Sequence, residues 1–375
     1  MNKNKIYNYD FLIVGAGLIG SLTAISLLKK NYKVLVLEKN KSITNDTRTL
    51  AINANSRDFL DELGLWSKIS KNSESIDRII IKDFINDDDL IFDSPSDPMG
   101  SVIFNRELLQ VSRKVLKQQK CIHFYDFQEN KNDFELEKTL AINGKKFNFK
   151  KIIFTLGKNY SSMIGIKKFP FKTSQRSYVG FFNHTKSHKN FAYEYFTEIG
   201  PLAVLPAPDN NKNLSTFILS SKKNFNEESL RRLLIKNFQT THGRMLFKDK
   251  SVQFQLHPHI SKSYQNKYIL VGDTLRSIHP VAGQGWNLGV KDIQNLCSTL
   301  DQYSINHKNF NDFYYNKRVL ENISYLTFTS LLTSLYDNKS KFNSSIIKFA
   351  FSSLNKFQSL RKLFIKQAMG RLKLV

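Results

Sequence analysis

Two short glycine-rich segments, about 250 residues apart in the sequence, hold the residues best suited to bind a ligand. The chain has only 16 glycines in 375 residues, and seven of these lie within residues 15–20 and 272–289. Glycine is required where the backbone approaches a ligand closely or adopts a positive φ. The two segments therefore predict one large, phosphate-bearing cofactor held by main chain at both ends. The glycines concerned are Gly15, Gly17, Gly20, Gly272, Gly283, Gly285 and Gly289.

The elements expected around the first segment form a β-α-β unit. Residues 9–14 are predicted to be a buried strand, residues 18–30 a helix, and residues 33–37 a second strand that leads into Glu38. Glu38 lies 18 positions after the third glycine, where a dinucleotide-binding fold places the carboxylate that binds the adenosine ribose. We assign Glu38 and the adjacent Lys39 to the cofactor site.

Each glycine of the first segment has its own expected role. Gly15 allows the tight turn, Gly17 lets the backbone approach a pyrophosphate, and Gly20 lets the helix pack closely on the strand. The N-terminus of the helix that follows presents free N–H groups and a partial positive charge to the same pyrophosphate.

The second segment follows another buried strand, residues 268–271, and opens a helix predicted over residues 286–300. Asp273 comes at the end of that strand, where its carboxylate can bind a polyol. The free N–H groups of residues 283–289 can face a ring oxygen that carries negative charge. The N1–C2=O edge of a reduced flavin carries such a charge, so the two segments together predict FAD.

Between the two segments the hydrophobic period shortens to about two. Strands are predicted over residues 75–83, 89–93, 178–182, 191–196, 202–205 and 215–219, and helices over residues 105–117 and most of 309–375. The expected fold class is α/β: a Rossmann-like FAD-binding domain with an inserted antiparallel β-sheet substrate domain and a helical C-terminal region. The expected boundaries are 1–70, 98–165 and 266–305 for the FAD-binding domain, 71–97 and 166–265 for the substrate domain, and 306–375 for the C-terminal region.

Composition excludes several classes of protein. No run of 18 apolar residues occurs, so no transmembrane helix is expected. Only Cys121 and Cys297 are present, without CxxC spacing, which argues against structural zinc, iron–sulfur clusters and disulfides. The net charge of +24 attracts polyanions. No zinc-finger, RNP or recognition-helix pattern accompanies that charge, so we do not expect nucleic acid as a partner.

Residues 272–292 (GDTLRSIHPVAGQGWNLGVKD) resemble the second flavin motif of the FAD-dependent aromatic-ring hydroxylases, and within that group the ubiquinone-biosynthesis hydroxylases. Further matching segments follow in the order of that family along nearly the whole chain. They are Asp46-x-Arg48 with Leu50-Ala51, Gly64-Leu65-Trp66, residues 100–105 (GSVIFN), Glu194-Tyr195-Phe196, residues 200–206 (GPLAVLP), residues 315–318 and Ala368-Met369-Gly370.

This resemblance implies an FAD-dependent monooxygenase. NADPH or NADH would reduce the flavin, and O2 would form a C4a-hydroperoxide that hydroxylates the ring of a polyprenylated phenol on the way to ubiquinone. The protein would position the ring, exclude water and move the flavin, so neither a catalytic triad nor a metal is expected. His279 and Pro280 would lie beside the isoalloxazine, where a packed or orienting role for the imidazole is favoured over acid–base catalysis. The further cofactor-binding residues implied are Arg48, Asn105, Gln284, Asn287 and Leu288.

Two stretches depart from the pattern of the family. The usual Ala-Asp-Gly-x-x-Ser-x-x-Arg motif is replaced by Thr155-Leu156-Gly157, with Met163 in the arginine position. Because that motif supports both FAD and NADPH, the electron donor stays open. Arg276 stands where the family has histidine. It would either pair with a phosphate or be a neutral change at a surface turn.

The C-terminal segment suggests a membrane contact. Residues 338–375 contain nine Lys or Arg and no Asp or Glu. Helical spacing groups Phe357, Leu360, Leu363 and Phe364 into an apolar stripe beside basic residues. Such a helix can lie in an anionic membrane interface, which predicts a cytoplasmic protein held at the inner face of the cell membrane. The alternative is a helix packed on the cofactor domain with a solvated basic face.

Two other functions stay open on the sequence alone. One is an FAD hydroxylase of a soluble phenol, against which the basic and apolar C-terminus argues. The other is a non-catalytic, FAD-binding scaffold in a ubiquinone-biosynthesis protein complex, which the lost carboxylate and arginine at positions 156 and 163 favour.

Overall fold

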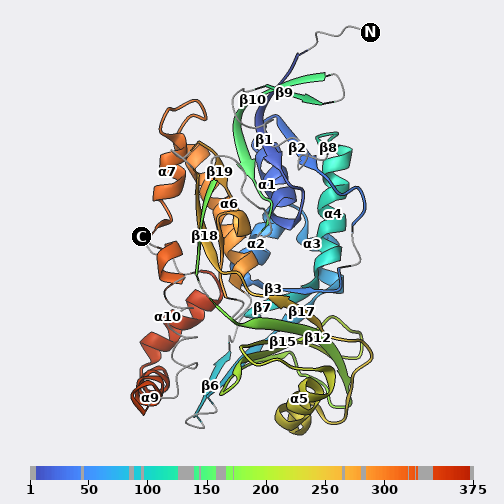
Figure 1. Cartoon of the computed structure of the whole chain (residues 1–375), viewed down its shortest axis with the longest axis vertical. Helices are drawn as coiled ribbons and strands as arrows, with labels where there is room; N and C mark the ends of the chain where they lie inside the picture. The colour runs from blue at the N-terminus through green and yellow to red at the C-terminus, as the bar shows by residue number, and fades with distance from the viewer. Residues whose placement is uncertain are drawn as a thin grey trace.

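The computed structural model describes residues 6–43, 46–83, 88–93, 97–125, 139–142, 145–157, 166–171, 173–263, 267–279, 284–319, 321–325, 327 and 341–371. Figure 1 shows two main layers along the long axis, a helix-covered parallel sheet at one end and a curved antiparallel sheet at the other.

The parallel layer joins strands that are far apart in the sequence. It consists of β1 (Ile6–Val14), β2 (Val34–Glu38), β8 (Ile122–Phe124), β9 (Thr139–Ile142), β10 (Lys145–Phe154) and β19 (Ile269–Leu270). The order is β19-β10-β1-β2-β8, and β9 pairs antiparallel with β10. Val14 pairs with Leu37 on one side and Phe154 on the other, so the carboxyl ends of these strands reach one edge. In open α/β sheets this edge is where ligands bind.

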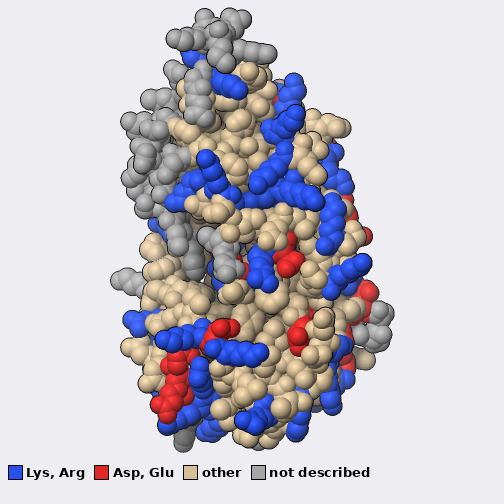
Figure 2. Space-filling view, turned by 90° about the vertical axis from the view of Figure 1, so that its right-hand side faces the viewer, with Lys and Arg blue, Asp and Glu red and all other residues tan. Residues whose placement is uncertain are grey.

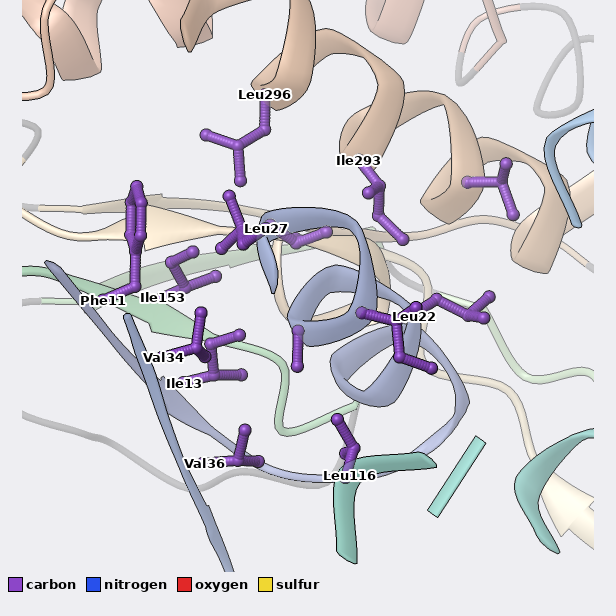
Figure 3. Packing of buried hydrophobic residues seen from close by; sticks show 14 of the residues in the cluster. Phe11, Ile13, Leu22, Leu27, Val34, Val36, Leu116, Ile153, Ile293 and Leu296 are labelled. Atoms are coloured by element: carbon purple, nitrogen blue, oxygen red, sulfur yellow. The ribbon is translucent and has the colours of Figure 1, made fainter. Parts of the chain in front are cut away.

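Three helices cover the parallel sheet: α1 (Leu18–Lys29), α4 (Asn105–Gln118) and α6 (Gln284–Gln302). Figure 3 shows Leu22 and Leu27 of α1 between Ile13 on the strand side and Ile293 on α6. Eight consecutive residues of α1, from position 20 to 27, are buried. A helix buried all round must be held by tertiary contacts, which fixes its N-terminus firmly relative to the strand edge.

The second layer is an eight-stranded sheet in the order β16-β12-β15-β14-β13-β5-β6, with β17 paired to β12. Among the strand pairs described for this sheet, only β13–β5 is parallel. Helix α5 (Glu227–His242) covers one face, where Phe238 stacks on Tyr195 at 4.6 Å between ring centroids. The strands are β5 (Arg78–Asp83), β6 (Asp88–Asp93), β12 (Arg176–His184), β13 (Phe191–Thr197), β14 (Gly200–Pro206), β15 (Leu214–Ser221), β16 (Met245–Leu246) and β17 (Val252–Gln255).

Two three-stranded sheets and several short helices complete the body. One sheet has the order β3-β7-β4 and the other β11-β18-β20. Their strands are β3 (Thr49–Asn53), β4 (Glu74–Ile76), β7 (Gly100–Phe104), β11 (Ile166–Pro170), β18 (His259–Ser263) and β20 (Arg276–Ser277). The short helices are α2 (Ala54–Glu62), α3 (Trp66–Ile69), η1 (Ser70–Asn72), η4 (Gly272–Thr274) and α7 (Phe310–Asn316).

The C-terminal helices α9 (Lys341–Lys356) and α10 (Gln358–Ala368) lie beside β6, at the edge of the second sheet. Phe351 of α9 joins a buried cluster with Phe92 of β6, and Phe364 of α10 stacks on Phe92 at 4.9 Å. The prediction that Phe357, Leu360, Leu363 and Phe364 form one apolar stripe is therefore wrong in part. Phe364 faces the protein, whereas Leu360 and Leu363 remain 43% and 49% exposed.

The α/β fold with a parallel sheet, inserted antiparallel strands and C-terminal helices is confirmed. The strand expected over residues 75–83 is in fact two strands, because β4 pairs with β7 while β5 pairs with β13 and β6. The expected domain boundaries remain a prediction.

Candidate cofactor site

The first glycine turn is closed on one side by Thr155. Gly15 has φ +103°, and a Cβ there would lie 2.7 Å from the Thr155 carbonyl oxygen. A Cβ at Gly20 would collide with the Gly15 carbonyl oxygen and Thr155 Oγ1. Thr155 Oγ1 donates to the Gly15 carbonyl at 2.7 Å. Gly15 and Gly20 thus serve the close packing of β1, α1 and β10.

Gly17 differs from its neighbours in the same turn. It is the N-cap of α1, with φ −68° and ψ −171°. Apart from its chain neighbours and the backbone of its own helix, no described protein atom lies within 4 Å of a Cβ built on it. The backbone here faces open space at a helix N-terminus, which is the arrangement that receives a phosphate.

Glu38 lies beside this turn and is 7% exposed. Its Oε2 accepts from the Ala16 backbone N–H at 2.7 Å and lies 3.2 Å from Arg113 Nη2. Arg113 of α4 also donates to the carbonyls of Ala16 and Asn40, both at 3.1 Å. Arg113 was not expected from the sequence, since no spacing signal links it to the glycine turn. Lys39, next to Glu38, is exposed.

The second glycine segment meets the first through one side chain. A Cβ at Gly272 would lie 3.1 Å from Ile19 Cγ2, and a Cβ at Gly289 would lie 2.7 Å from Ile19 Cδ1. Ile19 belongs to the first turn of α1. The two segments therefore lie side by side, because only glycine leaves room for Ile19. Gly285, like Gly17, has no described atom within 4 Å of a built Cβ.

Three of the predicted cofactor-binding residues, Arg48, Asn105 and Asp273, lie near one another, and the first two contact the carboxylate of Asp46. Asp46 Oδ2 lies 2.7 Å from Arg48 Nη2 and accepts from Asn105 Nδ2 at 3.0 Å. The hydrogen bond to Asp46 raises the pKa of Arg48, and the negative charge of Asp273 raises it further. Arg48, Asn105 and Asp273 thus share one neighbourhood.

The start of α6 is fixed by its own polar side chain. Asn287 Oδ1 accepts from the Asn53 backbone N–H at 3.1 Å, and Asn287 Nδ2 donates to the Ala51 carbonyl at 2.9 Å. Leu288 is 2% exposed, and Gln284 is half-buried. These contacts hold the N-terminal turn of α6 against β3.

His279 is 6% exposed, and its Nε2 lies 2.5 Å from Gln175 Oε1. Pro280 and Gly283 lie outside the described residues, as does Met163.

Of the two alternatives for Arg276, the neutral change at a surface turn is wrong, and pairing with a phosphate remains a prediction. The side chain is 3% exposed, so the residue is not at a surface turn. Its Nη1 lies 2.9 Å from both carboxylate oxygens of Asp292, so its partner in the protein is a buried carboxylate.

The residues present fit a dinucleotide cofactor. At Gly17 and at Gly285 the backbone faces open space that a side chain would occupy. Both residues lie at the start of a helix. Helix N-termini bind anionic groups. The carboxylates of Asp46 and Asp273, the amide of Asn105 and the guanidinium of Arg48 lie near one another.

Comparisons with known proteins agree with this geometry. Residues 8–120 and 183–306 match the model of a family described as FAD binding domain. The chain is 26% identical to the ubiquinone hydroxylase UbiL of Rhodospirillum rubrum, over 97% of this chain and 90% of that protein. It is 24% identical to the mitochondrial ubiquinone biosynthesis monooxygenase COQ6 of Dictyostelium discoideum, over 99% and 92%. The fold resembles the crystal structure of p-nitrophenol 4-monooxygenase PnpA from Pseudomonas putida, with a TM-score of 0.76, 17% identity and coverage of 99% and 100%.

Proposed function

The chain belongs to the FAD binding domain family, and on this basis we propose that it is an FAD-dependent monooxygenase that hydroxylates the aromatic ring of a polyprenylated phenol in ubiquinone biosynthesis. The observation that carries the proposal is the meeting of the two glycine segments at Ile19, with open backbone at Gly17 and Gly285. Relatives named as ubiquinone hydroxylases, aligned over nearly the full length of both chains, support the substrate class.

The proposed roles of the residues follow from their positions. Gly17 and the N-terminus of α1 hold the pyrophosphate, and Glu38 faces the adenosine ribose while Arg113 holds its carboxylate in place. Asp273 and Arg48 bind the polyol chain between the two halves of the site. The bound FAD supplies the chemistry that activates O2.

The residues of the second glycine segment hold the flavin-ring end of the cofactor. Gly285, with Gln284, Asn287 and Leu288, forms the start of α6 that faces the flavin ring. His279, held by Gln175, orients the neighbouring backbone instead of transferring protons. The protein then acts by binding the substrate ring and excluding water.

We further propose NADPH or NADH as the electron donor, although the departing motif leaves no carboxylate at position 156. Thr155 of this motif still braces the glycine turn, because its hydroxyl donates to the Gly15 carbonyl. The departing motif therefore keeps a structural function at the FAD end. Anaerobic mixing of the purified holoprotein with each nucleotide, followed by flavin absorbance, tests the donor. Absence of bleaching with both would contradict it.

A peripheral contact with an anionic membrane, at the inner face of the cell membrane, is part of the same proposal. No helix in the described part of the chain is both long enough and apolar enough to cross a membrane. Five large apolar side chains on α9, on α10 and at the junction between them are exposed instead: Ile346 (38%), Phe349 (75%), Phe357 (51%), Leu360 (43%) and Leu363 (49%). We call these five residues the outer apolar surface.

Basic side chains accompany the outer apolar surface. Residues 338–375 carry nine Lys or Arg and no acidic residue. The charge complements anionic lipid headgroups, and the apolar side chains can enter the acyl boundary. Because α9 packs on β6, docking would bring the second sheet to the bilayer in which a polyprenylated substrate dissolves.

The function is tested by lipid analysis of a strain that lacks this gene. We expect a prenylated phenol short of one hydroxyl group to accumulate, as measured by mass spectrometry of extracted quinones. The wild-type gene should restore ubiquinone, and a Gly285→Asp variant, which places a carboxylate in the cofactor site, should not. Unchanged ubiquinone and no precursor in the deletion strain would contradict the proposal, as would full rescue by the variant.

A further inference from the structure

A cluster of five charged side chains lies directly behind the second glycine segment, and three of them, Arg276, Asp292 and Arg318, are buried. Arg276 binds both oxygens of Asp292 at 2.9 Å, and Arg318 Nη1 lies 2.5 Å from Asp292 Oδ1. Arg318 Nε donates to Glu321 at 2.9 Å, and Glu321 also accepts from Lys291 at 2.6 Å. We call these five residues the charge cluster.

The charge cluster contains three cations and two carboxylates. Burial alone would lower the pKa of Arg318, but Asp292 and Glu321 raise it above its ordinary value. Burial alone would raise the pKa of Glu321, but Arg318 and Lys291 hold it low. Arg318 and Glu321 therefore stabilise each other in their charged forms. One positive charge is left without a counter-charge within this part of the described chain, which is costly unless an anion lies nearby.

The cluster touches the second glycine segment at two points. Asp292 Oδ2 accepts from the Gly272 backbone N–H at 3.0 Å. Arg276 Nη2 and Arg318 Nη1 donate to the Leu288 carbonyl at 3.0 and 3.3 Å. In addition, Arg276 Nε and Arg318 Nη2 are buried without a hydrogen-bond partner among the described residues. The excess positive charge therefore lies against the backbone that is proposed to face the flavin.

We propose that Arg276 supplies the positive charge that stabilises the reduced, anionic form of a flavin bound at the second glycine segment. This inference rests on FAD binding at the proposed site but not on the hydroxylation. The N-terminus of α6 adds a partial charge of the same sign. Because Arg276 is buried, its field is screened less than that of a surface charge. Arginine keeps its charge at any physiological pH, whereas a histidine at this position would titrate.

The test is the midpoint potential of the bound FAD in an Arg276→Gln variant of the full-length holoprotein. The substitution leaves two cations and two carboxylates, and Asp292 keeps its contacts with Arg318 and Gly272. We therefore expect the variant to fold and to bind oxidised FAD. Its preference for reduced over oxidised flavin should fall about tenfold, which corresponds to a potential about 30 mV lower for the two-electron couple.

Two controls separate charge from packing. Arg276→Lys retains the charge and should keep the potential close to that of the wild type, even if its melting temperature falls. Lys30→Gln removes a charge that pairs with Asp301 at the surface, at the other end of α1, and should leave the potential unchanged.

The remaining outcomes decide against the inference. An unchanged potential in Arg276→Gln, or equal shifts in the Gln and Lys variants, would show that Arg276 only supports the fold. If Arg276→Gln loses affinity for oxidised and reduced FAD equally, the charge of Arg276 acts on the diphosphate instead of the flavin ring. A wild-type protein that binds FAD without hydroxylating would overturn the proposed function alone, whereas one that binds no FAD would overturn both.

Discussion

Gly17 and Gly20 lie three residues apart, and side chains at these positions would meet different surroundings. At Gly20 an added Cβ meets the backbone of Gly15 and the side chain of Thr155, so the helix would have to move away from the strand. At Gly17 an added Cβ meets no described atom within 4 Å beyond its chain neighbours and the backbone of its own helix. The first position serves the fold, and the second is proposed to serve the ligand.

We expect Gly17→Asp to abolish FAD binding while keeping the fold. Aspartate is a favoured N-cap, and Gly17 already has the extended backbone that an N-cap residue adopts. Its carboxylate would repel the pyrophosphate. Flavin absorbance of the purified protein should be lost, whereas its melting temperature without cofactor should be equal to or above that of the wild-type apoprotein.

The matched substitution is Gly20→Ala, which we expect to lower stability by several kcal/mol, since overpacking against backbone has no easy relief. It should reduce soluble yield before any effect on FAD can be measured. If Gly17→Asp still binds FAD with wild-type affinity, the assignment of this turn to the pyrophosphate is wrong.

A group of three buried histidines predicts how stability depends on pH. His184, His188 and His242 are 4%, 2% and 1% exposed, and the rings of His184 and His242 lie 4.8 Å apart. Burial and the neighbouring His184 lower the pKa of His188 to about 4 and that of His242 to about 3. Nε2 of both residues has no hydrogen-bond partner among the described residues.

These shifts make the fold sensitive to acid. An unfolded histidine titrates near pH 6.5, so between about pH 4 and 6.5 the unfolded chain binds more protons than the folded chain. Stability is therefore fully present above pH 6.5 and falls as the pH decreases, by about 1.4 kcal/mol per pH unit for each histidine. Denaturant unfolding at several pH values should show that the free energy of unfolding depends less steeply on pH in His242→Gln than in the wild type. A slope equal to that of the wild type would contradict this.

At the scale of elements, α9 shows two aromatic residues with opposite environments. Phe351 is 7% exposed and lies in a cluster with Leu90 and Phe92 of β6. Phe349, two positions earlier, is 75% exposed. Packing on β6 therefore depends on the face of α9 that carries Phe351, and Phe349 lies on an exposed face.

We expect Phe351→Ala to release α9 and α10 locally, at a cost of about 3 kcal/mol. Cleavage within residues 341–371 by limited proteolysis should then accelerate on the order of a hundredfold, because the open population rises. Phe349→Ala is the matched control and should change stability by no more than about 0.5 kcal/mol. Equal protection of both variants would show that these helices are not held by this contact.

At the scale of the whole molecule, positive charge is not confined to the C-terminal helices. Figure 2 shows Lys and Arg spread over the upper half of the face on the α4 side, where Asp and Glu are few. A net charge of +24 will attract anionic vesicles in any orientation at low salt. A test of membrane docking must therefore remove apolar contacts and keep the charge.

We expect the triple variant Phe349→Ser, Leu360→Ser, Leu363→Ser to lose binding to vesicles that contain anionic lipid. The loss of at least about 3 kcal/mol of apolar transfer energy should weaken binding on the order of a hundredfold at physiological salt. Co-sedimentation with vesicles measures this, with bound FAD as the control for folding. Unchanged binding would place the contact elsewhere. A shift from dimer to monomer would instead identify a second copy of this chain as the partner.

The sequence by itself determined the two glycine segments, the β-α-β unit around the first, and the alternating strands of the second sheet. These features depend on local rules: glycine where φ is positive, and hydrophobic periods of two or 3.6 residues. The expected positions of Gly15, Gly20 and Glu38 follow from the same local pattern, and the matching family model covers both segments.

Tertiary structure alone decided which side chains surround those segments. Arg113 reaches Glu38 across 75 positions of sequence, and Ile19 meets Gly272 only because α1 and α6 share one core. The same holds for Arg276, whose partner Asp292 lies on the next helix. Burial and pairing of charges depend on packing between distant elements, and neither composition nor spacing carries that information.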